Sequence, residues 1–268
     1  MAVATKPLSD DLKLALEGAK GAAEIAMKYY ELDRQSLEVE LKADAGNSPV
    51  TIADKEVDQF LFNHFTTARP NYGWLSEEIE DNSKRLTQDT VWVVDPIDGT
   101  RSFIQQDDCF AISIALVKNG EAVLGIVYAP AKDELYYAEK GYGAYKNGEK
   151  LDANVLCASS PVAFGSRSEY ARGMLDPFKA EYDFENYGSI AYKLALVAEG
   201  RGVMFSLYPK SEWDCAAGVV LCNEANAKVT NIHGEPLSFN NENVIIDRLI
   251  AAPTCAYDAL FMHIQNYK

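Results

Sequence analysis

The sequence is poor in the residues that most often bind zinc or form disulfide bonds. It has only three histidines and five cysteines, and no Cys-x-x-Cys pair occurs. The histidines are His64, His233 and His263, and the cysteines are Cys109, Cys157, Cys215, Cys222 and Cys255. An odd number of scattered cysteines argues against both a zinc site and a disulfide framework. We therefore predict buried free thiols in a reducing cytosol.

Basic residues are also scarce relative to acidic ones. Lys and Arg total 25 against 40 Asp and Glu, which gives a formal net charge of −15 over 268 residues. A field of this sign disfavours direct binding to nucleic acid or to an anionic membrane. If the protein binds an anionic small molecule, local cations must overcome that field, and bound metal ions are one source of them.

Further absences narrow the functional class. No apolar run approaches the length of a membrane span, and residues 1–7 lack the apolar core of a signal peptide, so we expect a cytoplasmic protein without a membrane partner. The chain also contains no Gly-x-Ser-x-Gly, no Walker A motif and no Gly-x-Gly-x-x-Gly. These absences argue against a serine hydrolase, a phosphate-binding loop and a dinucleotide-binding fold.

Apolar periodicity predicts helices followed by an antiparallel sheet in the first part of the chain. Ser9 is a helix cap for residues 10–30, and Thr51 caps a second helix with an apolar stripe that ends at Phe65. Two strand-like runs between residues 110 and 130 flank Asn119-Gly120, which is a strong hairpin signal. A meander continues from there to about residue 148.

After about residue 152 the pattern changes to alternating strands and helices. The predicted strands cover residues 155–164, 203–207 and 244–252, and the predicted helices cover 189–199, 213–226 and 256–267. The fold class is therefore α+β. We divide the chain into an α+β half, 1–152, and an α/β half, 153–268, which should pack together because no flexible linker separates them.

The motif Asp95-Pro96-Ile97-Asp98-Gly99-Thr100 is the most informative part of the chain. It follows the apolar run 91–94, which is typical of a buried strand. Two carboxylates three positions apart at a strand end suit hard divalent cations, which prefer oxygen ligands. Gly99 lets the backbone approach a ligand, and the following amides can point at a phosphate. The same residues are common in turns, so the motif alone leaves a simple turn open.

Three other acidic positions are candidates for the same site. Glu77-Glu78 follows a predicted strand, Asp214 would begin a helix that continues into the small residues 215–218, and Asp54 lies in the first turn of the helix capped by Thr51. Each position also has a simpler interpretation. Loop acids are commonly solvated, and a carboxylate at the positive end of a helix stabilises that helix.

Taken in this order and spacing, the motifs 77–78, 95–100 and 213–218 resemble the inositol monophosphatase superfamily, whose members are Mg²⁺-dependent, lithium-sensitive phosphomonoesterases. The resemblance covers nearly the whole chain, from residues 47–54 to the last helix. It implies a layered αβαβα sandwich, with an antiparallel sheet in the N-terminal half and a mixed α/β layer in the C-terminal half. It also implies two or three Mg²⁺ ions in each active site.

The resemblance implies a role for each matching residue. The first metal would be held by Glu77, Asp95 and the carbonyl of Ile97, and the second by Asp95, Asp98 and Asp214. The catalytic residues would be Thr100, Asp54 and Glu77: the threonine helps to deprotonate the attacking water, and Asp54 hydrogen-bonds that threonine. The substrate contacts would include Asp98 and the amides of Gly99 and Thr100. Most metal ligands thus lie in the N-terminal half, and Asp214 comes from the C-terminal half.

Several details are most similar to the bacterial 3'(2'),5'-bisphosphate nucleotidases of this superfamily, among them residues 75–78 and 211–214. This closer resemblance adds Lys193, which could meet a second phosphate, and Glu212 to the substrate-binding residues. A solvated helix lysine is the simpler interpretation of Lys193. Ile97 and the run 101–103 depart from the nucleotidase pattern and look more like inositol or histidinol phosphatases.

The prediction is therefore hydrolysis of a small-molecule phosphate monoester, namely adenosine 3',5'-bisphosphate to AMP and phosphate. Inositol 1-phosphate is the alternative substrate; Trp213 argues against histidinol phosphatases, which tend to have tyrosine there. A non-catalytic interaction protein is an alternative of another class, against which the intact set of metal ligands argues. The resemblance also allows a homodimer.

Overall fold

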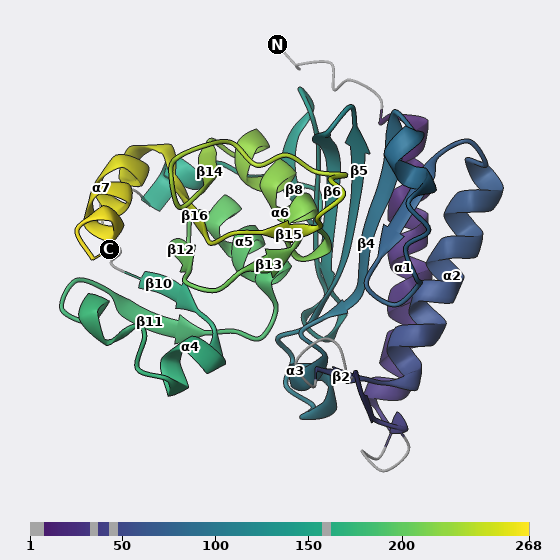
Figure 1. Ribbon diagram of the computed structural model, residues 1–268, viewed down its shortest axis with the longest axis horizontal. Helices are drawn as coiled ribbons and strands as arrows, with labels where there is room; N and C mark the ends of the chain where they lie inside the picture. Colours follow the sequence, from purple (N-terminus) through teal and green to yellow (C-terminus); the bar gives the residue numbers. More distant parts are fainter. Residues whose placement is uncertain (1–7, 33–36, 43–47, 157–161, 268) are drawn as a thin grey trace.

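The computed structural model describes residues 8–32, 37–42, 48–156 and 162–267, and two β-sheets dominate it (Figure 1). The helices are α1 (Asp10–Tyr30), α2 (Ile52–Ala68), α3 (Thr100–Ile104), α4 (Arg167–Ala171), α5 (Ile190–Ala198), α6 (Glu212–Glu224) and α7 (Thr254–Gln265). The strands are β1 (Glu40–Leu41), β2 (Pro49–Val50), β3 (Gly73–Ser76), β4 (Thr90–Asp98), β5 (Ala111–Lys118), β6 (Glu121–Ala129), β7 (Glu134–Glu139), β8 (Gly143–Lys146), β9 (Glu149–Lys150), β10 (Val162–Gly165), β11 (Asp183–Asn186), β12 (Val203–Ser206), β13 (Lys210–Ser211), β14 (Ala227–Asn231), β15 (Ile245–Ile246) and β16 (Leu249–Pro253).

The helices and sheets are stacked as a layered αβαβα sandwich (Figure 1). Helices α1 and α2 cover one face of the seven-stranded sheet, and α5 and α6 lie between this sheet and the five-stranded sheet. Helix α7 covers the outer face of the five-stranded sheet. The layered α+β architecture predicted from the sequence is confirmed.

The first two helices begin where their capping residues predict. The Ser9 hydroxyl accepts a hydrogen bond from the amide of Leu12, which satisfies one of the free donors at the start of α1. Thr51 and Asp54 form a reciprocal capping box at the start of α2. This second cap matters for function because it holds the Asp54 side chain in one orientation.

The seven-stranded sheet has the order β3-β4-β5-β6-β7-β8-β9. It is antiparallel, as predicted, except that β3 and β4 are parallel neighbours. The predicted hairpin joins β5 and β6, and both turn residues, Asn119 and Gly120, have positive φ angles of 51° and 80°. This conformation suits the right-handed twist of the two strands.

The five-stranded sheet is mixed, with the order β11-β10-β12-β16-β14. Strands β10, β11 and β12 are parallel, whereas β16 is antiparallel to both β12 and β14. The stretch 244–252 holds a strand, as predicted, but this strand, β16, begins only at Leu249, and the earlier residues contain β15 of another sheet. Residues 153–156 form a short 3-10 turn instead of the predicted strand, which begins only at Val162, and residues 157–161 lie outside the described part.

Helix α6 approaches the seven-stranded sheet closely because it is lined with small residues. A Cβ atom on Gly125 of β6 would lie 2.3 Å from the carbonyl oxygen of Ala217, and one on Gly218 would lie 2.4 Å from the Cβ of Leu194 on α5. Buried side chains from both halves, such as Val127 and Val220, belong to one hydrophobic cluster. The boundary near residue 152 stays a prediction.

The thiol prediction is only partly confirmed. Cys109, Cys215 and Cys222 are buried free cysteines, Cys157 lies outside the described residues, and Cys255 is disulfide-bonded, so free thiols were wrongly predicted at that position. Among the described helices, none combines the length and apolarity needed to cross a membrane.

The contact between β6 and α6 gives a stability prediction. Gly125→Ala should lower the free energy of unfolding by about 1–3 kcal/mol, because the new methyl group meets backbone atoms that cannot move aside. Gly21→Ala on α1 is the matched control: its Cβ would lie 2.4 Å from Phe60, but only from the end of that ring. Because alanine also favours the helix, Gly21→Ala should change stability by less than about 1 kcal/mol. Urea unfolding measures both, and equal effects would contradict the close packing.

Candidate active site

Strands β3 and β4 bring two predicted metal ligands to one edge of the seven-stranded sheet. Their parallel register pairs Ser76 with Val94, so Glu77, the first residue after β3, follows beside Asp95 in the last part of β4. The register of β4 against β5 then shifts between Asp95 and Asp98. Such a bulge redirects side chains at a strand end. The amide of Ile97 donates to the Asp95 carboxylate at 3.0 Å and holds the turn closed.

Gly99 is required by the geometry of this turn. It has a φ of +93° and caps the short helix α3. A Cβ atom at this position would lie 3.1 Å from the amide nitrogen of Ser189 and 3.2 Å from the carbonyl oxygen of Cys109. Both the left-handed backbone and the close neighbours therefore favour glycine. The turn presents Thr100 toward the same cavity as Asp95 and Asp98.

The C-terminal half supplies the third carboxylate. Ligand atoms of Asp95, Asp98 and Asp214 all lie within 4.8 Å of one another. Asp98 accepts hydrogen bonds from the Ser189 hydroxyl at 2.7 Å and from the Ala191 amide at 2.6 Å, at the start of α5. Asp214 lies in the first turn of α6 and accepts from the amide of Ser211 at 2.9 Å. The fold thus brings together three acids that sequence analysis placed in one site.

Glu77 lines the same cavity, and a lysine compensates its charge. The Lys42 amino group lies 2.8 Å from the Glu77 carboxylate and 2.6 Å from that of Glu78. Sequence analysis did not identify Lys42, because no motif marks it. Lys42 is far from Glu77 and Glu78 in sequence, and only the tertiary fold brings its amino group to their carboxylates.

Thr100 and Asp54 are in contact, as the resemblance implied. The Thr100 hydroxyl lies 3.2 Å from both the Asp54 carboxylate and the carbonyl oxygen of Ile97. The other carboxylate oxygen of Asp54 accepts from the amide and hydroxyl of Thr51 in the capping box. One aspartate therefore both starts α2 and orients the Thr100 hydroxyl.

Burial and mutual repulsion shape the electrostatics of these acids. Burial raises the pKa of Asp98 to about 6, although hydrogen bonds from Ser189 and Ala191 and the charge of Lys193 oppose the change. Burial, followed by the nearby carboxylates of Asp98 and Glu77, raises the pKa of Asp214 to about 8. The pKa of Asp95 is raised well above its usual range, first by burial and then by Glu77, Asp98 and Asp214.

This arrangement suits a divalent cation. Carboxylates that repel one another in a buried site are stabilised when a cation neutralises them, and all the candidate donors are oxygen atoms, which Mg²⁺ prefers. The residues present therefore fit a hard metal ion.

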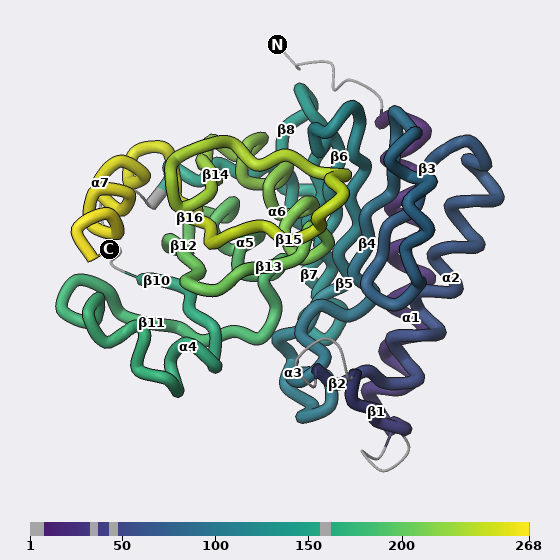
Figure 2. Tube along the Cα trace, in the orientation of Figure 1, coloured from purple at the N-terminus to yellow at the C-terminus, as the bar shows by residue number. Residues whose placement is uncertain are grey.

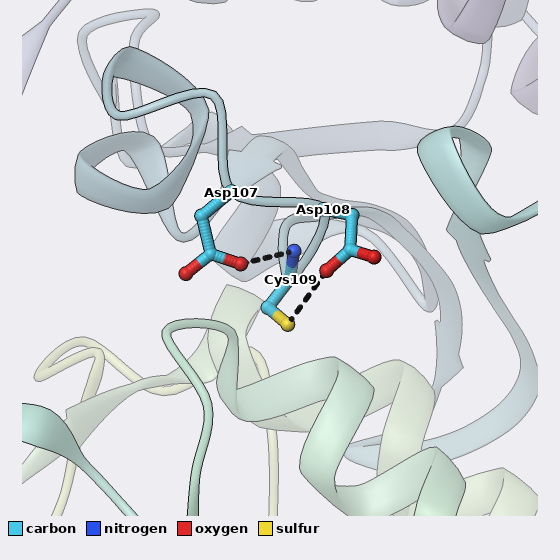
Figure 3. Close-up of side chains that lie close together, drawn as sticks. All are labelled: Asp107, Asp108 and Cys109. Carbon is cyan, nitrogen blue, oxygen red and sulfur yellow. Dashed lines mark hydrogen bonds between the residues drawn. The ribbon is translucent and has the colours of Figure 1, made fainter.

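A second cluster of possible metal ligands, formed by Asp107, Asp108 and Cys109, is less suited to a metal ion (Figure 3). Asp107 accepts from the Cys109 amide and pairs with Arg167, and Asp108 accepts from the Cys109 thiol and pairs with Lys132 at 2.7 Å. Burial raises the pKa of the Cys109 thiol to about 12. These acids already have cationic partners, and a thiol that stays protonated is a poor metal ligand.

Lys193 does not occupy the position expected of it. Every residue of α5 is buried, and the Lys193 side chain is 1% exposed. Its amino group donates to the carbonyl oxygens of Tyr187 at 3.3 Å and Gly165 at 3.5 Å. Burial lowers its pKa to about 8. Neither expectation, a solvated lysine or a lysine that points into the cleft, agrees with this placement, because α5 is enclosed between the two sheets.

Glu212 does not line the cavity that contains the carboxylates, and its role in substrate binding stays a prediction. It is buried at the start of α6, and its carboxylate accepts from the amides of Asn240 and Asn241 and from the side chain of Asn241. Residues i and i+2 of a helix point in nearly opposite directions. Because Asp214 faces the other carboxylates, Glu212 faces away from them.

A cavity of about 480 Å³ opens beside the carboxylates, a size that suits a small molecule. Its lining combines Glu77, Asp95, Asp98 and Asp214 with two arginines, Arg101 from α3 and Arg167 from α4. Neither arginine was predicted as a site residue. The position of Arg101 directly after the motif 95–100 was the available signal for that residue.

Comparisons with known proteins identify the family and the fold of the chain. The model of the inositol monophosphatase family matches residues 8–265. Inositol-1-monophosphatase of Bacillus subtilis is 34% identical over 85% of this chain and 88% of its own length. The 3'(2'),5'-bisphosphate nucleotidase CysQ of Aggregatibacter actinomycetemcomitans is 33% identical over 92% of this chain and 93% of its own length. The crystal structure of the suppressor protein suhB from Bartonella henselae, 28% identical, has a TM-score of 0.81 and covers 96% of this chain and 98% of its own.

The raised pKa values predict how metal-free protein responds to pH. In the folded protein Asp98 keeps its proton up to about pH 6 and Asp214 up to about pH 8. In the unfolded chain both lose their protons near the ordinary pKa of 3.8. Their contribution to stability is therefore complete below about pH 4 and is lost as the pH rises through about 6 to 8. In the presence of a chelator, urea unfolding should show falling stability across this range, on the order of a few kcal/mol.

Asp214→Asn should flatten that decline, because it removes one of the repelling charges. Asp183→Asn, at an exposed position on β11, is the control and should keep the wild-type slope. Wild-type protein that is as stable at pH 8 as at pH 5 without metal would contradict the repulsion inferred here.

Proposed function

Because the chain belongs to the inositol monophosphatase family and is a phosphoric monoester hydrolase, we propose that it hydrolyses adenosine 3',5'-bisphosphate to AMP and phosphate. The proposal specifies a bisphosphate nucleotide as substrate and Mg²⁺ as the metal. It is supported by the carboxylates that lie close together in the lining of the cavity and by the two arginines of the same lining.

The proposed metal ligands are four carboxylates that line the cavity, Glu77, Asp95, Asp98 and Asp214, and the carbonyl of Ile97. Glu77, Asp95 and the carbonyl of Ile97 would hold one Mg²⁺, and Asp95, Asp98 and Asp214 would hold a second, with two or three ions per site in all. When bound, such ions neutralise the phosphate and make a water molecule more acidic. Lys42 would have to release Glu77, because a carboxylate that binds metal gains less from an ion pair.

Thr100 and Asp54 would move the proton of the attacking water. The Thr100 hydroxyl can accept that proton only if it gives its own proton to Asp54, and the two side chains lie 3.2 Å apart for this transfer. Thr51 orients Asp54 through its amide and hydroxyl, so the acceptor stays in place. The amides of Gly99 and Thr100 would donate to the phosphate group, and Asp98 would act on it through the metal ion that it holds. Pre-arranged donors of this kind supply much of the rate enhancement in enzymes.

The arginines support a substrate with a second phosphate. Arg101 and Arg167 line the cavity that contains Asp95, Asp98 and Asp214, in a chain whose overall charge is −15. A phosphate held at the metal ligands would leave another phosphate of the same nucleotide near this cationic rim. Guanidinium groups bind phosphate through paired hydrogen bonds. This juxtaposition is the observation that carries the choice of a bisphosphate.

Inositol 1-phosphate is the second candidate, and one contact favours it. Arg167 already pairs with Asp107, and it donates to the side chain of Gln105 at 2.9 Å. If that pairing persists in the complex, Arg101 is the remaining rim arginine, and a substrate with one phosphate would suffice. The similarity to the Bacillus subtilis inositol-1-monophosphatase supports the same candidate.

Thr100→Ala tests the proton-transfer role. It should lower kcat by about 10²-fold or more while KM changes little, because the hydroxyl acts on the water rather than on bound substrate. Asp54→Asn should follow the same pattern more mildly. Thr87→Ala, at an exposed threonine, is the control and should retain full activity. Phosphate release at saturating Mg²⁺ gives both constants, and a change confined to KM would show that these roles are wrong.

A substrate panel tests the proposed reaction. Wild-type enzyme should release phosphate from adenosine 3',5'-bisphosphate with a higher kcat/KM than from inositol 1-phosphate or histidinol phosphate. Arg101→Ala should raise KM for the bisphosphate between about fivefold and a hundredfold, and leave that for inositol 1-phosphate within about twofold. Arg248→Ala, which removes an arginine paired with Asp247, should change neither. A preference for inositol 1-phosphate would replace the nucleotidase proposal with its alternative.

A further inference from the structure

A polar network built on two buried residues, Arg85 and Glu212, joins the loop that follows Glu77 to the start of α6, which carries Asp214. We call it the Arg85–Glu212 network; it consists of Asp81, Arg85, Asn240, Asn241 and Glu212. Asp81 follows Glu77 by four residues, and Glu212 precedes Asp214 by two. The segment between β14 and β15, which contains both asparagines, passes over α6 toward the seven-stranded sheet (Figure 2). The amide of Phe239 in this segment donates to the carbonyl of Gly120 at the β5–β6 turn.

Arg85 is the N-terminal anchor of the network. It is one of the largest buried side chains, with 2% exposed. Its guanidinium group pairs with Asp81 through two donors, at 3.1 Å and 2.8 Å. It also donates to the side chain of Asn240 at 2.8 Å and to the carbonyl of Asn241 at 3.0 Å, while its own carbonyl accepts from Asn240. One arginine therefore ties the loop after β3 to the segment before β15.

Glu212 is the C-terminal anchor. Its carboxylate, fully buried, accepts from the amide of Asn240 at 2.6 Å, from the amide of Asn241 at 2.9 Å and from the Asn241 side chain at 2.8 Å. The amide of Glu212 donates to the carbonyl of Val244. The same short segment thus binds Arg85 on one side and the first residue of α6 on the other.

The two buried charges of this network, on Arg85 and Glu212, each depend on their hydrogen-bond partners. Arg85 is buried with Asp81 beside it, and Glu212 is buried with three donors rather than a cation. A buried charge that loses a partner is costly, because water cannot replace the lost hydrogen bond. The network should therefore resist changes in the separation of its two ends.

We propose that Arg85 and Glu212 are positioning residues that hold Asp214 at a fixed place relative to Glu77, and so set the affinity of the site for its metal. The inference rests on the metal role proposed above. Glu212 touches none of the other carboxylates; it acts through the start of α6, where the amide of Ser211 in turn orients Asp214. Glu212 then has a role in metal binding and is more than a packing residue.

The test compares two glutamates at opposite ends of α6. Glu212→Gln replaces one accepting oxygen with a donor and leaves one of the asparagine donors without its acceptor. Glu224→Gln is the matched control: Glu224 accepts from two loop amides, Gly141 at 2.9 Å and Gly143 at 2.8 Å, at the end of the helix far from Asp214. Both variants should lose stability in urea unfolding.

Calorimetric titration with Mg²⁺, without substrate, separates positioning from packing. Glu212→Gln should bind Mg²⁺ about tenfold more weakly than wild type, the lower end of the effect seen when support for a metal ligand is removed. Glu224→Gln should bind as wild type does. Arg85→Lys, which keeps the charge but loses the fork of donors, should weaken binding in the same direction as Glu212→Gln.

Equal Mg²⁺ affinity in Glu212→Gln and Glu224→Gln would overturn the proposal and leave Glu212 as a packing residue. If Glu212→Gln does not fold, Asn241→Ala replaces it: this variant removes one donor to Glu212 and should weaken Mg²⁺ binding by a smaller factor. Unchanged affinity in Asn241→Ala would also overturn the proposal. The Mg²⁺ titration contains no substrate, so it tests the positioning role independently of the proposed reaction. Wild-type protein that binds Mg²⁺ but does not hydrolyse the bisphosphate would refute the proposed substrate and leave the positioning role intact.

Discussion

The repulsion between buried carboxylates is the constraint on which the rest of this structure depends. Asp95, Asp98 and Asp214 lie within 4.8 Å of one another in a chain that already carries a net charge of −15. Folding must oppose that repulsion, and the surrounding contacts do so locally. The hydroxyl and amide at the start of α5 donate to Asp98, the amide of Ser211 donates to Asp214, and the charges of Lys193 and Lys210 act on Asp98 and Asp214 respectively. A divalent cation would complete this compensation.

The packing of α6 follows from the same constraint. Asp214 belongs to the C-terminal half and must reach acids that lie at the edge of the seven-stranded sheet. It can do so because α6 lies directly against that sheet, where the backbone of Gly125 meets that of Ala217. The run of small residues 215–218 after Asp214 permits this close contact. A larger residue at this contact would push the helix, and the carboxylate with it, away from the site.

Lys193 and Glu212 show where a sequence resemblance stops short of a functional assignment. Neither residue lines the cavity, although the charge of Lys193 acts on Asp98. Glu212 is two positions from Asp214 on a helix, which turns its side chain to nearly the opposite direction. Lys193 lies on a helix buried on every side, so helical periodicity could not show whether it faces solvent, core or cleft. Its amino group instead satisfies two backbone carbonyl oxygens.

What the sequence determined by itself is local. The caps Ser9 and Thr51, the Asn119-Gly120 hairpin and the acidic motif 95–100 depend on neighbours a few residues apart, so their structures could be predicted. The resemblance to a family added the set of acids that meet. Only the tertiary structure decided which cations face those acids, that Arg101 and Arg167 line the cavity, and that Glu212 binds a segment nearly thirty residues further along the chain. These contacts join residues far apart in sequence. They exist because the layers pack in one way, and no local pattern encodes that packing.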